Sequence, residues 1–494
     1  LKWIDTMIEE DILLNGREEN RNSSGPALEH LEAVDSWGGA TTTVSYVYRP
    51  VTKEQLFEAF QLARRSGLSV GLRGGGNSYG DAALNSEQIL LDLRRMNRIL
   101  AWDPIQGVVR VEPGVSLSQL WQYILEDGWW PPVVTGTSAT TVGGCAGMNV
   151  HGKNAYQVGT IGDHILEFDL MLPSGEIVTC SRDNNSDLFY AAIGGFGMLG
   201  IFTSITMQMK RIYSGYLDVF TQTQHDLDGM FDYFNAYAGA SDYIVGWINS
   251  FGKGSALGEG DVHRANYLPP GADLAPSQSL RLENQHLTPN MFGILPRSIV
   301  WMGMRPFMNN LGTSLVNRAK MISGRFGGTR QYRQTHAAFH FLLDYVPDWK
   351  NAYGPGGLIQ YQPFIPKETA RDAFADILRL CQRRGIPNYL TVFKRHRPDD
   401  FLMTHGLDGF SMAMDFRVTD SRRGPIESLA YEMDEIVLAA GGRFYLAKDS
   451  TLRPSVAEAY LGKETIAEFK GLKAKYDPED MLQTDLWRRI FAGL

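Results

Sequence analysis

The sequence predicts an α+β fold, and three observations support this class. Between residues 40 and 212, segments with the helical spacing of apolar residues alternate with short segments that have the pattern of β-strands. Glycine-rich turns separate these segments. Beyond residue 212 the segments lengthen and aromatic residues become more frequent. We therefore expect two units of mixed helix and strand, with a boundary near residue 212.

Capping residues mark the helices expected in the first unit. Thr52 is placed to cap a helix, Gln55 completes a capping box, and Gly67 ends the helix. Ser116 caps a second helix that stops at Gly128. The other elements expected in this unit are a strand over 68–72, a strand over 107–112, a hairpin over 168–179, a short helix over 187–193 and a strand over 201–209.

The ends of the chain differ from its centre. Residues 1–36 are polar, so we expect an N-terminal extension outside the first domain. Amphipathic helices are expected over 370–385 and 429–441, where apolar residues recur at helical spacing. The predicted organisation is an extension over 1–36, a first domain over 37–212, a second domain over 213–440 and a C-terminal segment over 441–494.

The composition is that of an ordinary globular protein and argues against some classes of function. Of 494 residues, 44% are hydrophobic and 21% are charged, and the formal net charge is -8. Proteins that bind nucleic acid usually carry a surplus of basic residues, so we expect no nucleic-acid partner. The scattered Cys145, Cys180 and Cys381 indicate neither a disulfide framework nor a metal site. The sequence has no run of about 18 or more apolar residues and no secretory signal, so we expect a cytoplasmic protein without a transmembrane segment.

Three glycine-rich segments are the strongest candidates for a ligand site. They are 73–80, which follows the strand expected over 68–72, then 135–153, and then 194–200. Consecutive glycines adopt backbone angles closed to other residues, and their N–H groups can converge on a phosphate. An isolated segment of this kind is more often a tight structural turn. Three of them in one half of the chain favour a long ligand with a phosphate group at its centre.

Two nucleotide-binding motifs do not fit these segments. The dinucleotide fingerprint G-x-G-x-x-G needs a third glycine where Tyr79 stands. Residues 147–153 match the glycine and lysine positions of a P-loop, but Asn154 stands where Ser or Thr should bind Mg²⁺. A P-loop phosphate transferase is therefore a remote alternative.

Longer strings around these glycines resemble a known flavoprotein superfamily. RGGGNSYGDAALN (73–85), TGTSATTVGGCAGMNVHGKN (135–154), VGTIGDHI (158–165) and IGGFGMLGI (193–201) are similar to the FAD domain of the vanillyl-alcohol oxidase and p-cresol methylhydroxylase (PCMH) superfamily. YGPGGLIQYQ (353–362), VFK (392–394) and GGRFYLAKDS (441–450) resemble its subfamily of decaprenylphosphoryl-β-D-ribose 2-oxidase-like flavoenzymes. The resemblance runs in order from residue 40 to residue 490 and is looser over 213–345.

The resemblance implies a PCMH-type FAD-binding domain of two subdomains, capped by an α+β substrate-binding domain. In these terms 37–212 binds FAD, 213–440 binds the substrate, and 441–494 completes the active site. Backbone groups from Gly74 to Ser78 would hold the pyrophosphate, and Ile201 would lie near the adenine. The residues expected to contact FAD are Arg73, Gly74, Gly75, Gly76, Asn77, Ser78, Tyr79, Gly136, Thr137, Thr140, Thr141, Gly143, Gly144, Gly147, Asn149, Gly197 and Ile201.

Asn77 bears on how the cofactor is held. Many members of the superfamily have a histidine at this point, bonded to the flavin. Asn77 has no imidazole nitrogen to form that bond, so we expect FAD to be bound non-covalently. Cys145 is left as an alternative attachment point.

The resemblance also implies the residues that carry the chemistry. Lys448 is expected to place a positive charge beside the reduced flavin or to bind the substrate hydroxyl, rather than to be an ordinary surface lysine. His151 is expected either to act as the base or only to order the pocket, and Tyr79 to lie over the ring system or to bond the hydroxyl. The residues expected to bind the substrate are Lys153, Trp247, Gln360, Gln362, Lys394 and Ser411.

The function that follows is oxidation of a primary or secondary hydroxyl of a sugar-like substrate, by hydride transfer to flavin N5, with oxygen or a quinone as acceptor. Ser411 and Ala413 depart from the Asn and Cys of the subfamily, so the substrate itself does not carry over. The alternatives are another PCMH-type chemistry, namely an alditol or lactone oxidase or a reductase of C=C bonds, and a flavin-binding protein without turnover.

Overall fold

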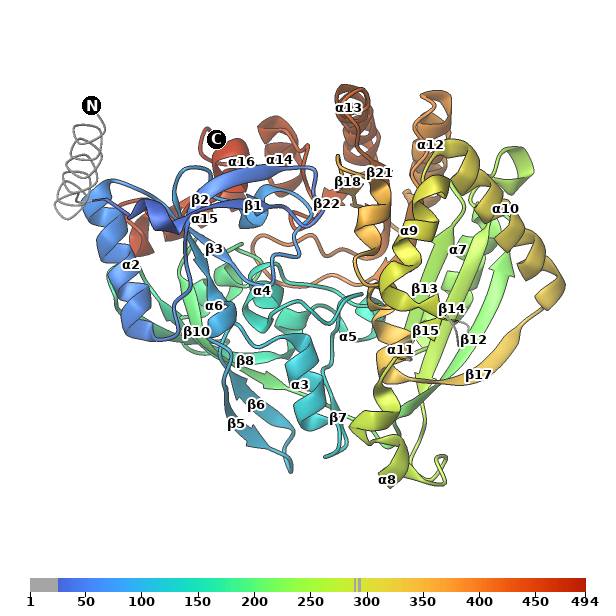
Figure 1. The fold of residues 1–494 in the computed structure, drawn as a ribbon, viewed down its shortest axis with the longest axis horizontal. Coiled ribbons are helices and arrows are strands. Elements are labelled where there is room, and N and C mark those ends of the chain that lie inside the picture. The colour runs from blue at the N-terminus through green and yellow to red at the C-terminus, as the bar shows by residue number, and fades with distance from the viewer. Residues whose placement is uncertain (1–24, 288–289, 292–294) are drawn as a thin grey trace, which may run out of the picture.

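The computed structural model describes residues 25–287, 290–291 and 295–494, and its chain begins with a mixed sheet (Figure 1). The strands of this first sheet, in spatial order, are β1 (Leu31–Asp35), β2 (Thr42–Tyr48), β4 (Ile89–Asp92) and β3 (Val70–Arg73). β1 pairs with β2 antiparallel, whereas β4 pairs with β2 and β3 in parallel. Helix α2 (Lys53–Ser66) connects β2 to β3 and packs Leu56 and Phe60 into the core of this sheet.

The cap and the stop predicted for α2 are present, but the capping box is not formed, because Gln55 Oε1 accepts a hydrogen bond from the Val51 N–H (2.8 Å) and not from the Thr52 N–H. The Thr52 hydroxyl accepts a hydrogen bond from the backbone N–H of Gln55, and Gly67 adopts a φ of 64° at the other end, where an L side chain would be strained. β1, however, lies inside the extension predicted for 1–36 and pairs with β2 from Leu31 opposite Tyr46 to Asp35 opposite Thr42. The first sheet has therefore begun before residue 37, and residues 1–24 lie outside the described part.

The second sheet is antiparallel. Its strands, in spatial order, are β5 (Ile99–Asp103), β6 (Val108–Val111), β10 (Ile201–Gln208), β8 (Ile165–Met171) and β9 (Ile177–Ser181). β8 and β9 form the hairpin predicted over 168–179, and Gly175 turns it with a φ of 92°. The helices and short strands around this sheet are α3 (Leu117–Ile124), β7 (Trp129–Trp130), α4 (Val142–Gly147), α5 (Ala155–Val158), α6 (Ser186–Ala192) and β11 (Lys210–Arg211).

The second half of the chain builds a large antiparallel sheet. Its strands are β12 (Tyr216–Gln224), β13 (Tyr243–Ile248), β14 (Gly260–Tyr267), β17 (Arg330–Thr335), β18 (Leu358–Tyr361), β19 (Pro363–Pro366), β20 (Leu390–His396), β21 (Gly409–Arg417) and β22 (Arg443–Phe444). The spatial order is β17-β12-β14-β13-β20-β21-β19-β22, and β18 pairs with β21 off this path. The segments between β14 and β18 are α8 (Pro276–Ser279), β15 (Asn290–Met291), β16 (Leu295–Pro296), α9 (Val300–Met304), α10 (Asn310–Gly327) and α11 (His336–His340).

Three helices pack on this large sheet and supply much of the core: α7 (Leu227–Tyr237), α12 (Ala370–Arg383) and α13 (Arg423–Ala439). The helix predicted over 370–385 is α12. α13 starts six residues earlier than the helix predicted over 429–441, because Pro425 lies in its first turn, where a missing N–H costs no hydrogen bond.

The C-terminal segment returns to the first sheet. It contains α14 (Pro454–Leu461), α15 (Lys463–Tyr476) and α16 (Asp485–Ile490), and its red helices lie beside the blue strands in Figure 1. The Val70 N–H donates to the Met481 carbonyl (2.8 Å), and the Gln483 N–H donates to the Val70 carbonyl (3.0 Å). The two ends of the described chain therefore fold together.

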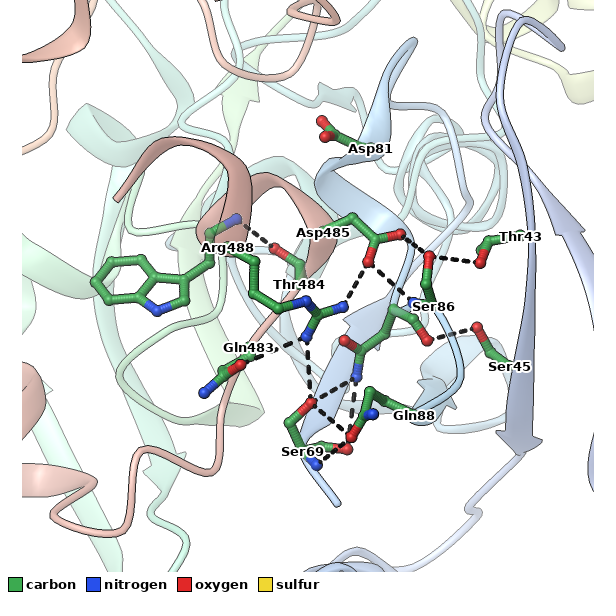
Figure 2. A network of polar contacts seen from close by, with 12 residues as sticks. Thr43, Ser45, Ser69, Asp81, Ser86, Gln88, Gln483, Thr484, Asp485 and Arg488 are labelled. Carbon is green, nitrogen blue, oxygen red and sulfur yellow. Dashed lines mark hydrogen bonds and ion pairs between the residues drawn. The ribbon is translucent and has the colours of Figure 1, made fainter. Parts of the chain in front are cut away.

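Figure 2 shows the polar contacts that fasten α16 to this sheet. The Asp485 carboxylate accepts hydrogen bonds from the Ser86 backbone N–H (2.9 Å) and from the Ser86 hydroxyl (2.7 Å). Arg488 donates to Asp485 (2.5 Å) and to the Ser69 hydroxyl (3.3 Å). Beside this network, Arg489 donates to Asp81 (2.7 Å) and to Asp449 (2.6 Å). These bonds connect the C-terminal segment to the loop that follows β3.

Within the described part of the chain, no helix is long and apolar enough to cross a membrane. Cys145, Cys180 and Cys381 are buried free thiols.

Candidate active site

A cavity of 610 Å³ is lined by the three larger sheets and by the C-terminal segment. This volume lies within the range of about 300–1,000 Å³ that is usual for small-molecule and cofactor sites. Its lining includes Leu72 of β3, Phe202 of β10, Trp247 of β13, Ala413 of β21 and Lys448. Residues of the first two sheets thus meet residues of the large sheet across the cavity.

One part of the lining, which we call the glycine wall, consists of small residues from the first two glycine-rich segments. Its members are Gly74, Gly75, Gly76, Gly136, Thr137, Thr140, Thr141, Gly143, Gly144 and Gly147. The two segments interlock closely. A Cβ on Gly74 would lie 2.3 Å from the Thr141 hydroxyl oxygen, and a Cβ on Gly143 would lie 2.5 Å from Pro113 Cβ. Side chains are excluded at Gly74 and Gly143 because neighbouring atoms leave no room for a Cβ.

The glycine wall fits a phosphate-containing cofactor. Gly76 has a φ of 66°, which an L side chain rarely adopts, and it follows two further glycines on the cavity surface. Gly147 differs from its neighbours, since a Cβ there would meet no protein atom within 4 Å. Its bare backbone therefore faces free volume, which a bound ligand can fill. Backbone N–H donors without side chains in front of them are the arrangement that binds a pyrophosphate.

The other part of the lining, the polar wall, carries lysine, histidine and glutamine side chains. Its members are His151, Lys153, Gln360, Gln362, Lys394 and Lys448. Lys448 follows β22, and its Nζ lies 3.6 Å from the centre of the Tyr79 ring. The Tyr79 backbone N–H donates to the Ala447 carbonyl (3.0 Å). The first glycine-rich segment is thereby fixed at Tyr79 against the loop that holds Lys448.

Asp415 is the counter-charge of Lys448. Its side chain is fully buried on β21, and Gln360 Nε2 donates to its Oδ1 (2.5 Å). Burial raises the pKa of Asp415 despite the Gln360 hydrogen bond and the Lys448 charge. Burial also lowers the pKa of Lys448, Asp415 opposes that shift, and Lys394 adds to it. Burial thus disfavours the charged form of both groups, while the attraction between the two charges favours it.

His151 is held by contacts to both ring nitrogens. Gln362 Nε2 lies 3.1 Å from His151 Nε2, and Lys394 Nζ lies 3.5 Å from His151 Nδ1. Gln362 is itself bonded to the Ser411 hydroxyl (3.2 Å), which lies 2.7 Å from His396 Nε2. Burial, followed by Lys394, holds the pKa of His151 well below its usual value. His151 is therefore a neutral imidazole in a fixed orientation.

Two further lysines have unusual surroundings. Burial lowers the pKa of Lys394 to about 8, and burial together with Lys394 lowers that of Lys153 to about 7. Lys153 Nζ donates to the carbonyls of Phe339 and His340 in α11. Trp247 lies on the cavity with Lys320 above its ring, 3.5 Å from the centre. In the part of the chain that the structure describes, no group of His, Cys, Asp and Glu side chains is arranged to hold a metal ion.

Most residues that the sequence predicts for the site line the cavity. Beyond the members of the two walls, these are Asn77, Ser78, Tyr79, Gly197 and Trp247.

Four predicted residues are not among the lining residues, and each has a physical reason. Arg73 turns back to donate to the carbonyls of Ala83 (3.1 Å) and Asp35 (3.0 Å). Asn149 is buried between Asp399 and the Gly162 N–H. The Ile201 side chain is in the core that α2 covers. Ser411 is fully buried behind Gln362, so its expected contact with the substrate is corrected to a contact with Gln362 and His396.

Sequence reasoning missed Asp415 and His396. Asp415 follows Ser411 and Ala413 at two-residue intervals on β21, and alternation places these three side chains on one face of the strand. That spacing was a usable signal, because Ser411 was already a candidate and Ala413 was already a position where the sequence departs from the subfamily. His396 ends β20 opposite Gly409, and its contact with Ser411 depends on strand pairing that the sequence does not show.

A comparison with sequence families agrees with the glycine wall. A family model described as an FAD binding domain matches residues 44–181 of this chain. The matched range contains the first two glycine-rich segments and therefore the whole glycine wall.

Curated relatives extend the similarity to the polar wall. The chain is 29% identical to a decaprenylphosphoryl-β-D-ribose oxidase of Mycolicibacterium smegmatis over 460 residues, which cover 92% of this chain and 96% of the relative. It is 30% identical to an L-gulonolactone oxidase of Mus musculus over 161 residues, 33% of this chain and 36% of the relative. It is 27% identical to a D-arabinono-1,4-lactone oxidase of Yarrowia lipolytica over 234 residues, 46% and 43% of the two chains.

Proposed function

The chain belongs to the PCMH-type FAD-dependent oxidoreductases, as its motifs predicted, and from this premise we propose that it oxidises a hydroxyl group of a sugar or sugar-containing substrate. FAD bound in the cavity supplies the redox chemistry, since a flavin accepts the hydride that leaves the hydroxyl-bearing carbon. The observation that carries the proposal is the position of Lys448, on the wall of the same cavity as the glycine wall and within the electrostatic influence of buried Asp415.

The glycine wall would hold the pyrophosphate of FAD. The first and second sheets are then the two subdomains that hold FAD, and the large sheet is the cap over it. Asn77 lies on the cavity without an imidazole to bond the flavin. Burial raises the pKa of Cys145 to about 12, which keeps that thiol protonated and unreactive. These two features support FAD held without a covalent bond, and acid precipitation that leaves the yellow colour in the pellet would contradict it.

The Lys448–Asp415 pair would take the proton of the substrate hydroxyl. A base works best when its pKa lies near the working pH, and burial moves the pKa of Lys448 in that direction. When the C–H hydride leaves the substrate, the hydroxyl proton goes to the Lys448 amine, and a carbonyl remains. The ammonium formed is stabilised by Asp415 and by the face of the Tyr79 ring.

His151 would position the polar wall rather than act as the base. Both of its nitrogens face protein groups, Gln362 on one side and Lys394 on the other. Gln360, Gln362, Lys394 and Lys153 would then present hydrogen-bond donors and acceptors to the hydroxyl groups of the substrate. Such a set of convergent polar groups suits a sugar ring better than an apolar alcohol.

The relatives support a sugar-type substrate of one of two kinds. The names of the relatives give a ribose joined to a decaprenyl phosphate in one case and sugar-acid lactones in two others. A lactone oxidase is therefore the second candidate, and it requires the same removal of hydride and proton from a carbinol. We propose oxygen or a quinone as the acceptor of the electrons.

The test is anaerobic reduction of the FAD-loaded protein by a panel of free sugars, sugar phosphates, alditols and sugar-acid lactones. We expect a sugar or a lactone to bleach the visible flavin absorbance and to yield the corresponding carbonyl product. Reduction by alditols only would replace the proposed substrate class. Failure of every hydroxyl donor, with FAD bound and the enzyme folded, would refute the proposed function.

A further inference from the structure

The segment from β16 to Leu342, just beyond α11, has an unusual surface. Among the described residues, ten of the exposed large hydrophobic side chains lie between residues 295 and 342. These are Leu295, Ile299, Met302, Phe307, Leu311, Leu315, Val316, Ile322, Tyr332 and Leu342. Single apolar residues scattered over a protein surface are normal. A cluster of this size in one short segment indicates a binding surface.

Helix α10 shows that this exposure is organised. Leu311, Leu315 and Ile322 are 72%, 57% and 48% exposed and lie on one stripe, because residues spaced by three, four and seven share a helical face. The opposite side of the helix packs on the large sheet through buried Met321 and Asn317, which donates to Asn249 (3.1 Å). The helix is thus held on its inner side and presents leucine and isoleucine outward.

The same segment is basic in an acidic protein. The 60 residues between Glu283 and Asp344 contain no Asp or Glu, whereas the whole chain has a net charge of -8. The basic residues of this stretch are Arg297, Arg305, Arg318, Lys320, Arg325, Arg330 and Arg333. Arg305, Arg318 and Arg330 are exposed, and Arg318 lies on the apolar stripe of α10 itself. We call Ile299, Met302, Phe307, Leu311, Leu315 and Ile322 with Arg305 and Arg318 the apolar–basic face.

We propose that the apolar–basic face docks the protein onto the surface of an anionic phospholipid bilayer. A helix that lies in the plane of a bilayer buries apolar side chains among the acyl chains and places arginines at the anionic head groups. The charge favours this occupant over a second copy of the chain, because two copies would bring the same acid-free basic stretches together. A nucleic-acid backbone matches the charge but offers no apolar layer for the leucines.

Docking in this way would place the cavity next to the membrane. Met304, Tyr332 and Leu342 line the cavity and belong to the same segment, and Tyr332 and Leu342 are also exposed to solvent. The cavity therefore opens beside the apolar–basic face. α9 and α10, yellow to olive in Figure 1, form the part of the molecule that would contact the bilayer.

The test is co-sedimentation of the FAD-loaded protein with phosphatidylcholine vesicles, with and without phosphatidylglycerol. We expect binding that requires phosphatidylglycerol and weakens in high salt. The double variant Arg305→Gln, Arg318→Gln should lose about 30-fold in partition coefficient, because each arginine near an anionic leaflet contributes about fivefold. The double variant Leu311→Gln, Leu315→Gln should lose about tenfold or more. Each double variant has a matched control that changes exposed residues elsewhere on the protein. The control for the arginine pair is Arg65→Gln with Arg95→Gln, the control for the leucine pair is Ile105→Gln with Leu274→Gln, and both should bind like the wild type.

A second measurement detects vesicle contact directly and needs no variant that loses vesicle binding. Because the three native cysteines are buried, Leu315→Cys and Ile105→Cys can each be labelled selectively with an environment-sensitive dye. We expect the emission of the dye at position 315 to shift to the blue on phosphatidylglycerol vesicles, and the dye at position 105 to stay unchanged. The proposal would be overturned if the protein bound no vesicles or bound neutral and anionic vesicles equally. It would also be overturned if the only effect of Leu311→Gln, Leu315→Gln were to dissociate a dimer.

Discussion

The two walls of the cavity bind in different ways. The glycine wall works through backbone, because side chains are excluded where Gly74 meets Thr141 and where Gly143 meets Pro113. The polar wall works through side chains: His151 and Lys153 come from the second glycine-rich segment, Gln360, Gln362 and Lys394 from the strands of the large sheet and the link between β18 and β19, and Lys448 from the C-terminal segment. The first wall is thus suited to holding a cofactor through backbone groups, and the second to contacting a substrate through side chains.

This difference predicts different kinds of damage. A change on the polar wall should slow the chemistry and leave the cofactor bound. A change on the glycine wall should weaken cofactor binding and leave the chemistry of the remaining holoenzyme intact. The following predictions, in order of expected size, test that separation.

The largest effect is expected at Lys448. In Lys448→Ala the anaerobic rate of flavin reduction should fall by about 10²- to 10⁴-fold, because the acceptor of the hydroxyl proton is removed. Lys448→Arg keeps the charge but cannot accept a proton at neutral pH, so it should be nearly as slow. Stopped-flow reduction measures both variants, with exposed Lys253→Ala as the control. Wild-type rates in Lys448→Arg would show that Lys448 acts by charge alone.

Gly147→Ala should separate the cofactor from the fold. The added methyl meets no protein atom within 4 Å, so the FAD-free protein should unfold at the wild-type temperature. Affinity for FAD should fall by about tenfold to 100-fold, because the methyl enters the volume assigned to the cofactor. Gly471→Ala, which also meets open space but lies in α15, is the control. FAD affinity is measured by fluorescence titration. Unchanged affinity in Gly147→Ala would show that the cofactor does not bind against this wall.

A smaller effect is expected where His151 is positioned. Gln362→Met removes the partner of His151 Nε2, and we expect flavin reduction to slow by about tenfold as the imidazole loses its fixed orientation. Ser411→Ala should slow it less, since Ser411 touches Gln362 and not the cavity. If His151 were the base instead of Lys448, His151→Gln would slow flavin reduction as much as Lys448→Ala does. That outcome would assign the role of base to His151.

The smallest effect concerns stability and pH. The pKa of Lys394 is about 8 in the folded protein, below its unfolded value, so between pH 8 and about 10.5 the unfolded chain holds a proton that the folded chain has lost. The penalty for burying this lysine is therefore full below pH 8 and fades as pH rises. Lys394→Met should raise the melting temperature by about 2 °C at pH 7 and by less at pH 10. Exposed Lys253→Met should show no such trend, and a constant gain in Lys394→Met would mean that its pKa is not lowered.

The two walls also differ in how far the sequence predicts them. Glycines reveal a backbone site directly, because few other residues tolerate such close approach, so the glycine wall was predicted except for residues that face away from it. Arg73 and Ile201 stand next to this wall in sequence but point behind it. Lys448, Gln360 and Lys394 were found only through motifs, since a buried lysine has no local signature.

The failures on the polar wall have a common cause. Ser411 and Asp415 lie on a strand that is buried along nearly its whole length, where neither hydrophobic periodicity nor polarity shows which residues reach the cavity. The pairing of β21 with β18 and β20 decides it, placing Asp415 opposite Gln360 and Ser411 opposite Lys394. Such pairings join residues far apart in the chain, so no local sequence pattern predicts them.

The measurement that tests the central claim most directly is anaerobic single-turnover reduction of the FAD-loaded protein by the best sugar or lactone, with hydrogen or deuterium on the carbon that bears the reacting hydroxyl. The account predicts that the substrate bleaches the flavin absorbance, that deuterium slows the bleaching, and that the product is a carbonyl compound. If no hydroxyl donor reduces the flavin, while the chemically reduced protein passes its electrons to a C=C bond, the account is contradicted and the protein is a reductase.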